Sequence, residues 1–429
     1  MRKLISFFIV LVFLLISCAR KPEELKWNYK IDDIVEPATS LTHDSVEIFL
    51  FLDATTSMKG FVTNPNSVYN ELLDQFESSV QTGWKSVKFR FFKFGTKFKE
   101  IDRHQFRQAK TRIYYEEPGI YEKTNIDSVI DFIGSNYKSS QIYIIITDLF
   151  QDEADINLVT SKIKENCFSK NISMGILCVK SDFDGMVFDA KVPPYRFKSK
   201  PGDVSTYRNL FVLMFGSNQN LKHLFETLSG IRYIDKQYFL LISPKLVSHF
   251  SVTVSKAKTN IKLTPKSSKK ELNLFNFNLK DKISTIPLNV EVEFTTVPYI
   301  PEINGQKINL ISYRKFVSSD KKFSYDSSLS SDVTIKEVTK SGNVIKAIIE
   351  VSIQESKGIY SYLIYFLPSV IDGFIIPEWI KEFSSDNPNP QRDPNKTLNL
   401  ERFISDLIKA NVSVNQPKIS KFYINFYKF

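Results

Sequence analysis

Residues 46–61 read VEIFLFLDATTSMKGF, and this stretch decides how the first half of the chain is interpreted. The apolar run Val46–Leu52 predicts a strand that is buried on both faces of a sheet. The run ends on Asp53, and three hydroxyl residues follow within the next four positions. Such residues satisfy backbone N–H groups at turns and helix starts without any ligand. The same oxygens also suit Mg²⁺, which prefers a few carboxylates together with neutral oxygen ligands.

Strand and helix patterns alternate along the rest of this half. Further strands are predicted at 87–95, 141–148, 172–179 and 210–217, and amphipathic helices at 67–82, 124–134, 156–167 and 221–228. This alternation predicts a doubly wound α/β domain with a mostly parallel sheet over residues 43–230, with its core at 43–180. Ligands bind at the carboxyl ends of the strands in such folds.

Residues 231–429 show a different pattern. Runs of β-branched and aromatic residues alternate with polar turns, which predicts an all-β, sandwich-like region. A loop-helix insertion at 376–410 interrupts it. Its Pro/Asn-rich stretch SSDNPNPQRDPNKT (384–397) is predicted to be a surface loop, and the helix that follows is predicted to pack through one face, formed by Leu400, Phe403, Ile404 and Leu407.

Polar residues from three predicted loops form one constellation. Asp53, Thr55 and Ser57 follow the first strand, Thr124 opens a later helix, and Asp148 ends another strand. This order resembles a von Willebrand factor A (integrin I-like) domain, in which such residues form a metal-ion-dependent adhesion site. The resemblance covers about 43–180. It implies that Thr55 and Ser57 bind the ion directly, that the two carboxylates act partly through water, and that Thr124 joins when a ligand is engaged.

The chemistry of these residue types agrees with the resemblance. Two carboxylates neutralise a divalent cation, hydroxyls add neutral oxygens, and one position remains for an acidic group on a partner. Thr56 stands where glycine is frequent in the family, and a β-branched residue restricts the backbone there. The run DSSLS (326–330) also fits the short motif, but it follows no apolar strand and is interpreted as a polar turn.

The N-terminus predicts export. Arg2 and Lys3 precede an apolar segment that is too short to span a bilayer, and the segment ends in LISC (Leu15–Cys18). This pattern resembles a bacterial lipoprotein signal, which implies a signal peptide at 1–17, lipidation of Cys18 and a tether at 18–42. Ala19 favours the outer membrane of the cell envelope by the same resemblance. Cys167 and Cys178 could pair or remain buried thiols.

Other classes of function find little support. The net charge of +10 is spread along the chain, and the basic stretch 258–270 lacks interleaved aromatic residues, so no nucleic-acid partner is expected. A phosphohydrolase of the haloacid dehalogenase type would need a second carboxylate where Thr55 stands. No Gly-x-Ser-x-Gly motif and no Cys/His cluster occur. The protein is therefore not expected to be an enzyme.

Together these features predict a membrane-anchored lipoprotein that binds a protein partner through a divalent cation. The cation would be Mg²⁺, or Mn²⁺ or Ca²⁺, and the partner would contribute an acidic residue. The alternative is an envelope-assembly lipoprotein in which the A-type domain is a metal-free scaffold and the β-rich region makes the interactions.

Overall fold

The computed structural model describes most of the chain from residue 44 onward. The described ranges are 44–149, 153–189, 192–244, 247–254, 274–279, 285–294, 302–303, 308–318, 330–341, 344–353, 357–368, 374–387, 391–415 and 421–428. The predicted signal peptide, Cys18 and the tether lie outside the described residues, as does all of the DSSLS run except Ser330. Among the described residues, no helix combines the length and apolarity needed to cross a membrane.

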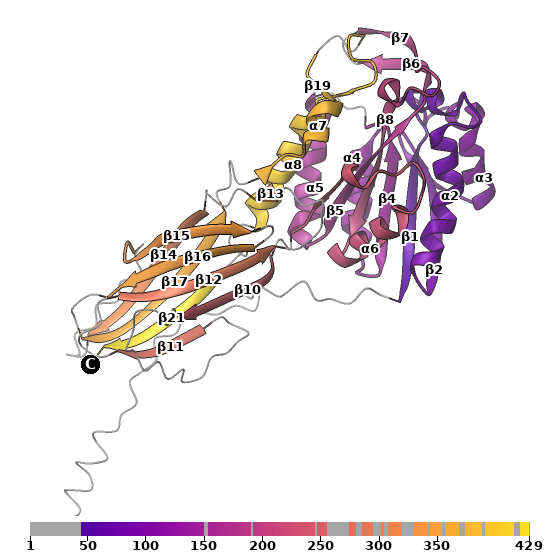
Figure 1. Cartoon of the computed structure of the whole chain (residues 1–429). Coiled ribbons are helices and arrows are strands. Elements are labelled where there is room, and N and C mark those ends of the chain that lie inside the picture. Colours follow the sequence, from indigo (N-terminus) through magenta and orange to yellow (C-terminus); the bar gives the residue numbers. More distant parts are fainter. Residues whose placement is uncertain are drawn as a thin grey trace, which may run out of the picture.

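The first part of the chain is built on a seven-stranded sheet in the order β3-β2-β1-β4-β8-β5-β9 (Figure 1). Its strands are β1 (Ser45–Asp53), β2 (Ser86–Phe94), β3 (Phe98–Ile101), β4 (Gln141–Thr147), β5 (Ser173–Ser181), β8 (Arg208–Gly216) and β9 (Phe239–Ile242). Because β9 belongs to this sheet, the α/β domain extends past residue 230, where the sequence placed the boundary.

The sheet is mixed, which corrects the expectation of a mostly parallel one. β1 pairs in parallel with β2 and β4, but β8 runs antiparallel to both β4 and β5. The reason lies in the connection after β5. A hairpin of β6 (Asp184–Asp189) and β7 (Val192–Lys198), with no crossover helix, links β5 to β8. A strand that returns from the same edge of the sheet must run antiparallel.

Helices cover both faces of the sheet. α2 (Val68–Gly83) and α6 (Asn218–Leu228) contribute to one core, and α4 (Ile126–Asn136) and α5 (Glu153–Asn166) contribute to the other. Alternate residues of β1 divide between the two cores, with Leu50 facing the first and Phe51 the second. The domain is completed by α3 (Arg103–Arg107), η2 (Thr56–Val62), η3 (Gln108–Lys110), η4 (Arg112–Tyr115), η5 (Phe168–Lys170), η6 (Val204–Thr206) and η7 (Lys236–Tyr238).

The predicted insertion packs on this α/β domain. α7 (Glu378–Phe383) and α8 (Leu400–Asn415) lie between the sheet domain and the β-rich part, with α8 beside α5 (Figure 1). All four residues of the predicted stripe in α8 are buried in the core that α4 and α5 share with the sheet: Leu400, Phe403, Ile404 and Leu407. The insertion is therefore part of the α/β core rather than a surface feature of the β-rich region.

The β-rich region contains two four-stranded sheets that share one apolar core. One sheet consists of β10 (Val247–Val254), β12 (Thr285–Phe294), β16 (Val344–Ser352) and β15 (Val333–Ser341). The other consists of β11 (Leu274–Leu279), β21 (Lys421–Lys428), β17 (Gly358–Pro368) and β14 (Ile308–Ser318). Within these two sheets all the pairs are antiparallel except β11–β21, which is parallel. Elsewhere β13 (Glu302–Ile303) pairs antiparallel with β18 (Phe374–Ile375), and within the insertion β19 (Ser384–Ser385) pairs in parallel with β20 (Thr397–Leu398).

The two cysteines of the α/β domain are free and buried, so the structure favours the thiol alternative over a disulfide. Burial raises the pKa of Cys167 and of Cys178 to about 12. Thiols with such a high pKa are poor nucleophiles at neutral pH.

Candidate functional site: the carboxyl edge of strands β1 and β4

The first loop folds around the Asp53 carboxylate. Thr55 donates both its backbone N–H (2.9 Å) and its hydroxyl (2.6 Å) to Asp53 Oδ1, which forms a compact turn at the end of β1. The Thr55 Oγ1 also lies 3.1 Å from Ser57 Oγ. Asp53 therefore shapes the turn, and the turn gathers hydroxyl oxygens beside its carboxylate.

The second loop is tied to the first by a backbone hydrogen bond, in which the N–H of Thr56 donates to the carbonyl of Tyr121 (3.2 Å). A side-chain hydrogen bond ties it to the turn after β2, where Asn125 donates to the Thr96 carbonyl (2.8 Å). Thr56 thus joins the two loops through its backbone and begins η2. This arrangement places Thr124 Oγ1 3.1 Å from Thr55 Oγ1 and 3.4 Å from Asp53 Oδ2.

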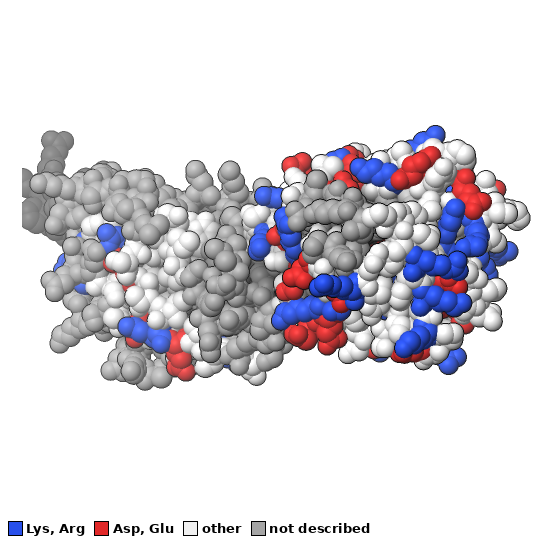
Figure 2. Space-filling model, turned by 90° about the horizontal axis from the view of Figure 1, so that it is seen from above, with Lys and Arg blue, Asp and Glu red and all other residues white. Residues whose placement is uncertain are grey.

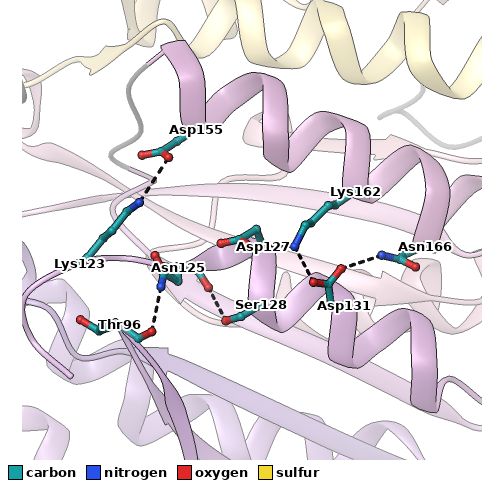
Figure 3. Close-up of polar contacts among 9 residues, drawn as sticks. All are labelled: Thr96, Lys123, Asn125, Asp127, Ser128, Asp131, Asp155, Lys162 and Asn166. Carbon is teal, nitrogen blue, oxygen red and sulfur yellow. Dashed lines mark hydrogen bonds and ion pairs between the residues drawn. The ribbon is translucent and has the colours of Figure 1, made fainter. Parts of the chain in front are cut away.

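Ion pairs anchor the second loop and its helix to α5 (Figure 3). Lys123 pairs with Asp155 at the start of α5, across 3.6 Å. Further along, Lys162 of α5 lies between Asp127 and Asp131 of α4. Exposed pairs of this kind stabilise a fold only weakly. We interpret them as contacts that orient α4, and with it the loop that carries Thr124.

The third loop follows β4. Thr147 donates its hydroxyl to Asp53 Oδ2 (2.7 Å) and accepts the N–H of Leu149 (3.1 Å). Leu149 is buried and has φ of 53°, a left-handed conformation that leucine seldom adopts. Backbone strain of this kind is often found at functional sites. The chain therefore turns sharply just after Asp148, which keeps that carboxylate at the edge of the sheet.

Burial makes the Asp53 carboxylate unusual. The residue has no exposed surface, and burial together with the nearby charge of Asp148 raises its pKa to about 7. The hydrogen bonds from Thr55 and Thr147 act in the opposite direction, because they stabilise the ionised form. A cation beside these two buried carboxylates would stabilise the ionised form of Asp53.

Together, the structure brings all five predicted residues to one edge of the sheet. Hydrogen bonds link Asp53, Thr55, Ser57 and Thr124, and Asp148 lies close enough for its charge to act on Asp53. We call these five residues the rim site. Within the part of the chain that the structure describes, no group of three or more Asp, Glu, His or Cys side chains is placed to hold a metal ion. The rim site is a different kind of group, because it combines only two carboxylates with three hydroxyls.

The spacing of the hydroxyls suits magnesium. Thr55 Oγ1 lies 3.1 Å from both Ser57 Oγ and Thr124 Oγ1. Oxygens at about 2.1 Å from Mg²⁺ and at right angles to each other are about 3.0 Å apart. Thr55 donates its hydroxyl proton to Asp53 and accepts the hydroxyl proton of Thr124, so a cation would take the place of the Thr124 proton at the Thr55 oxygen. The donor set and its spacing therefore fit a small divalent cation.

Gly95 provides a test of how the second loop is held. A Cβ on Gly95 would lie 1.9 Å from the Ile120 carbonyl oxygen, so Gly95→Ala must displace the loop that carries Thr124. We expect a loss of about 1–3 kcal/mol in unfolding free energy, measured by urea denaturation, as for other overpacked sites. Gly230→Ala is the matched control, because its Cβ would meet nothing closer than 3.5 Å. An equal effect of both substitutions would contradict this account.

Two residues of this edge were not identified from the sequence. Thr147 reads as the last residue of an apolar strand, although its hydroxyl binds Asp53. Arg208 stands two positions before the predicted strand 210–217, although the charge of Asp148 acts on its guanidinium. The polar residue next to Asp148 was a usable signal for Thr147. Arg208 lies at this edge because β8 runs antiparallel to β4, and an apolar run does not show in which direction a strand will run.

No protein-family model matches the chain, and no curated protein matches it. The charge distribution gives no strong indication of a partner either. In the view from above, Lys and Arg residues lie interspersed with Asp and Glu residues over the α/β domain (Figure 2). The functional interpretation therefore rests on the geometry of the rim site.

Proposed function

We propose that the rim site holds a divalent cation, Mg²⁺ or alternatively Mn²⁺ or Ca²⁺, and that the cation binds an acidic residue of a protein partner. Asp53, Thr55, Ser57, Thr124 and Asp148 would hold the ion, as the resemblance to von Willebrand factor A domains implies. When bound, the ion would supply positive charge and an open position for a carboxylate oxygen. In this proposal the protein is a binding protein and not an enzyme.

The spacing of the three hydroxyls around Thr55 supports the proposal most strongly. Hydroxyls that only cap a turn need to reach backbone groups, whereas these hydroxyls converge on one another from two loops about 70 positions apart in the sequence. The buried carboxylate beside them supplies the negative charge that a cation requires.

The proposal also includes the predicted location. The lipid on Cys18 would anchor the chain to a bacterial envelope membrane, with the outer membrane favoured by Ala19. The tether at 18–42 would then separate the α/β domain from the lipid. A binding site on a tethered domain suits adhesion or envelope assembly, in which the partner is another protein.

Cation titration tests this function. Isothermal titration of residues 19–429 with MgCl₂ and MnCl₂ should show binding, and the double variant Thr55→Val, Ser57→Ala should bind at least about 10-fold more weakly, because two neutral ligands are lost. Thr63→Val is the matched control, since its hydroxyl binds the Asp184 carbonyl outside the rim site. Equal affinities for wild type and the double variant would refute the proposal.

One observation favours the metal-free alternative. Both oxygens of Asp53 already accept hydrogen bonds, from Thr55 and Thr147, so the turn is satisfied without an ion. In that case the α/β domain is a scaffold and the β-rich region makes the interactions. A partner pulled down equally well with and without EDTA would favour this alternative.

A further inference from the structure

A buried arginine lies beside the rim site. Arg208 is the first residue of β8 and is only 8% exposed. Because β8 is antiparallel to β4, with Thr147 paired to Phe211, the first residues of β8 lie at the edge where β4 ends. Burial lowers the pKa of Arg208, and the negative charge of Asp148 raises it. The topology of the sheet thus brings a permanent positive charge to a carboxylate of the rim site.

A segment from the far end of the chain holds this arginine in place. The described residues 384–387 and 391–398, which we call the strap, lie between α7 and α8 in the chain. Arg208 Nη1 donates to the carbonyl of Pro394, and the neighbouring Asn209 donates to the Phe383 carbonyl (3.1 Å) and to Thr397 Oγ1 (2.9 Å). The Arg208 guanidinium also lies 5.1 Å from the ring centroid of Phe183.

The guanidinium is incompletely satisfied by these contacts. Tyr195 of β7 also interacts with the guanidinium, but among the described residues Arg208 Nε is buried and has no hydrogen-bond acceptor. A buried arginine that only fastened a loop would be expected to use its donors on that loop. The position of Arg208 near Asp148 instead indicates an electrostatic role toward the rim site.

We propose that Arg208 is the built-in counter-ion of Asp148 and that it competes with the divalent cation for this carboxylate. The inference rests on the proposed function, because it concerns the affinity of the same cation. Two positive groups near one buried carboxylate repel each other strongly, since the interior screens charge poorly. Arg208 therefore lowers the affinity for the cation and stabilises the edge when no cation is bound.

The direction of the effect separates this role from a structural one. If Arg208 only fastened the strap, its removal would loosen the edge and leave cation affinity unchanged or weaker. If it is a competing counter-ion, removal of its charge tightens cation binding. Charge-conserving replacement should leave the affinity close to that of the wild type.

The experiment is a titration of residues 19–429 with MgCl₂ alone. We expect Arg208→Gln to bind Mg²⁺ about 10-fold more tightly than wild type, and Arg208→Lys to stay within about 2-fold of wild type. Arg208→Met provides a second neutral variant if Arg208→Gln does not fold. Lys180→Gln is the matched control and should leave the affinity unchanged. Lys180 is half-buried, and its Nζ lies 4.1 Å from the ring centroid of Phe383, the last residue of α7.

The outcomes distinguish the two proposals. If wild type binds Mg²⁺ and a folded neutral variant binds it equally or more weakly, the counter-ion role is overturned and the cation site stands. If neither wild type nor the neutral variants bind Mg²⁺, the proposed function fails and the counter-ion role falls with it. Tighter binding by a neutral variant, without an equal change in Lys180→Gln, supports the inference.

Discussion

Leu407→Ala should destabilise the α/β domain by about 2–5 kcal/mol, although residue 407 lies more than 160 positions beyond the last strand of its sheet. Leu407 has no exposed surface and belongs to the core between the sheet and α5. Truncating a buried leucine loses its transfer free energy and leaves a cavity. Urea denaturation followed by the fluorescence of Trp84 would measure this, with Trp27 and Trp379 replaced by Phe.

Leu158→Ala is the matched control for this prediction. Leu158 lies on α5, which packs against α8, but 45% of it is exposed. Its truncation should change the unfolding free energy by less than about 0.5 kcal/mol. If Leu407→Ala left the urea midpoint reported by Trp84 fluorescence unchanged from wild type, α8 would not be part of the α/β core in solution.

Without divalent cations, the protein should lose stability as the pH rises from about 4 to about 7. The pKa of Asp53 is raised from its ordinary value of 3.8 to about 7, by burial first and by Asp148 second. Between these values the folded state keeps a proton that the unfolded state has released, so raising the pH favours unfolding. The loss should reach up to about 4 kcal/mol above pH 7, measured by urea denaturation in EDTA.

Two comparisons complete this test. Asp53→Asn should remove most of the pH dependence in this window, whereas Asp74→Asn, at an exposed position of α2, should keep it. Excess Mg²⁺ should restore the stability of wild type above pH 7, because an ion that binds the folded state stabilises it. An unfolding free energy in EDTA that does not change between pH 4 and pH 8 would contradict the environment described for Asp53.

Local sequence patterns predicted the strands and helices well, because apolar side chains recur at a different spacing in each. The apolar run Val46–Leu52 became β1, and the stripe in α8 was buried as expected. The partner of that stripe was not predictable, because a hydrophobic stripe shows which face is buried and not what covers it. The direction of β8 was equally hidden, since a strand buried on both faces is apolar throughout in either direction.

The rim site shows the same division between what could and could not be predicted. Its five residues were found because each follows or precedes a recognisable element, and the edge of the sheet brings them together. Thr147 was missed because its hydroxyl lies within the strand pattern. Arg208 was missed because its place at this edge depends on an antiparallel return that the βαβ expectation excluded. Contacts made by tertiary topology leave little trace in local sequence.

The position of α8 in the chain also determines when the α/β domain can close. The sheet is complete at β9, which ends at Ile242, but Phe403, Ile404 and Leu407 cover one of its faces from far downstream. A chain made from its N-terminus must therefore hold an open apolar surface while more than 150 further residues are synthesised. Contacts over such long sequence separations slow folding and extend the time during which chains can aggregate. We expect nascent chains that end before α8 to need a chaperone. Full-length chains should complete the α/β domain in one late folding step, when α8 docks.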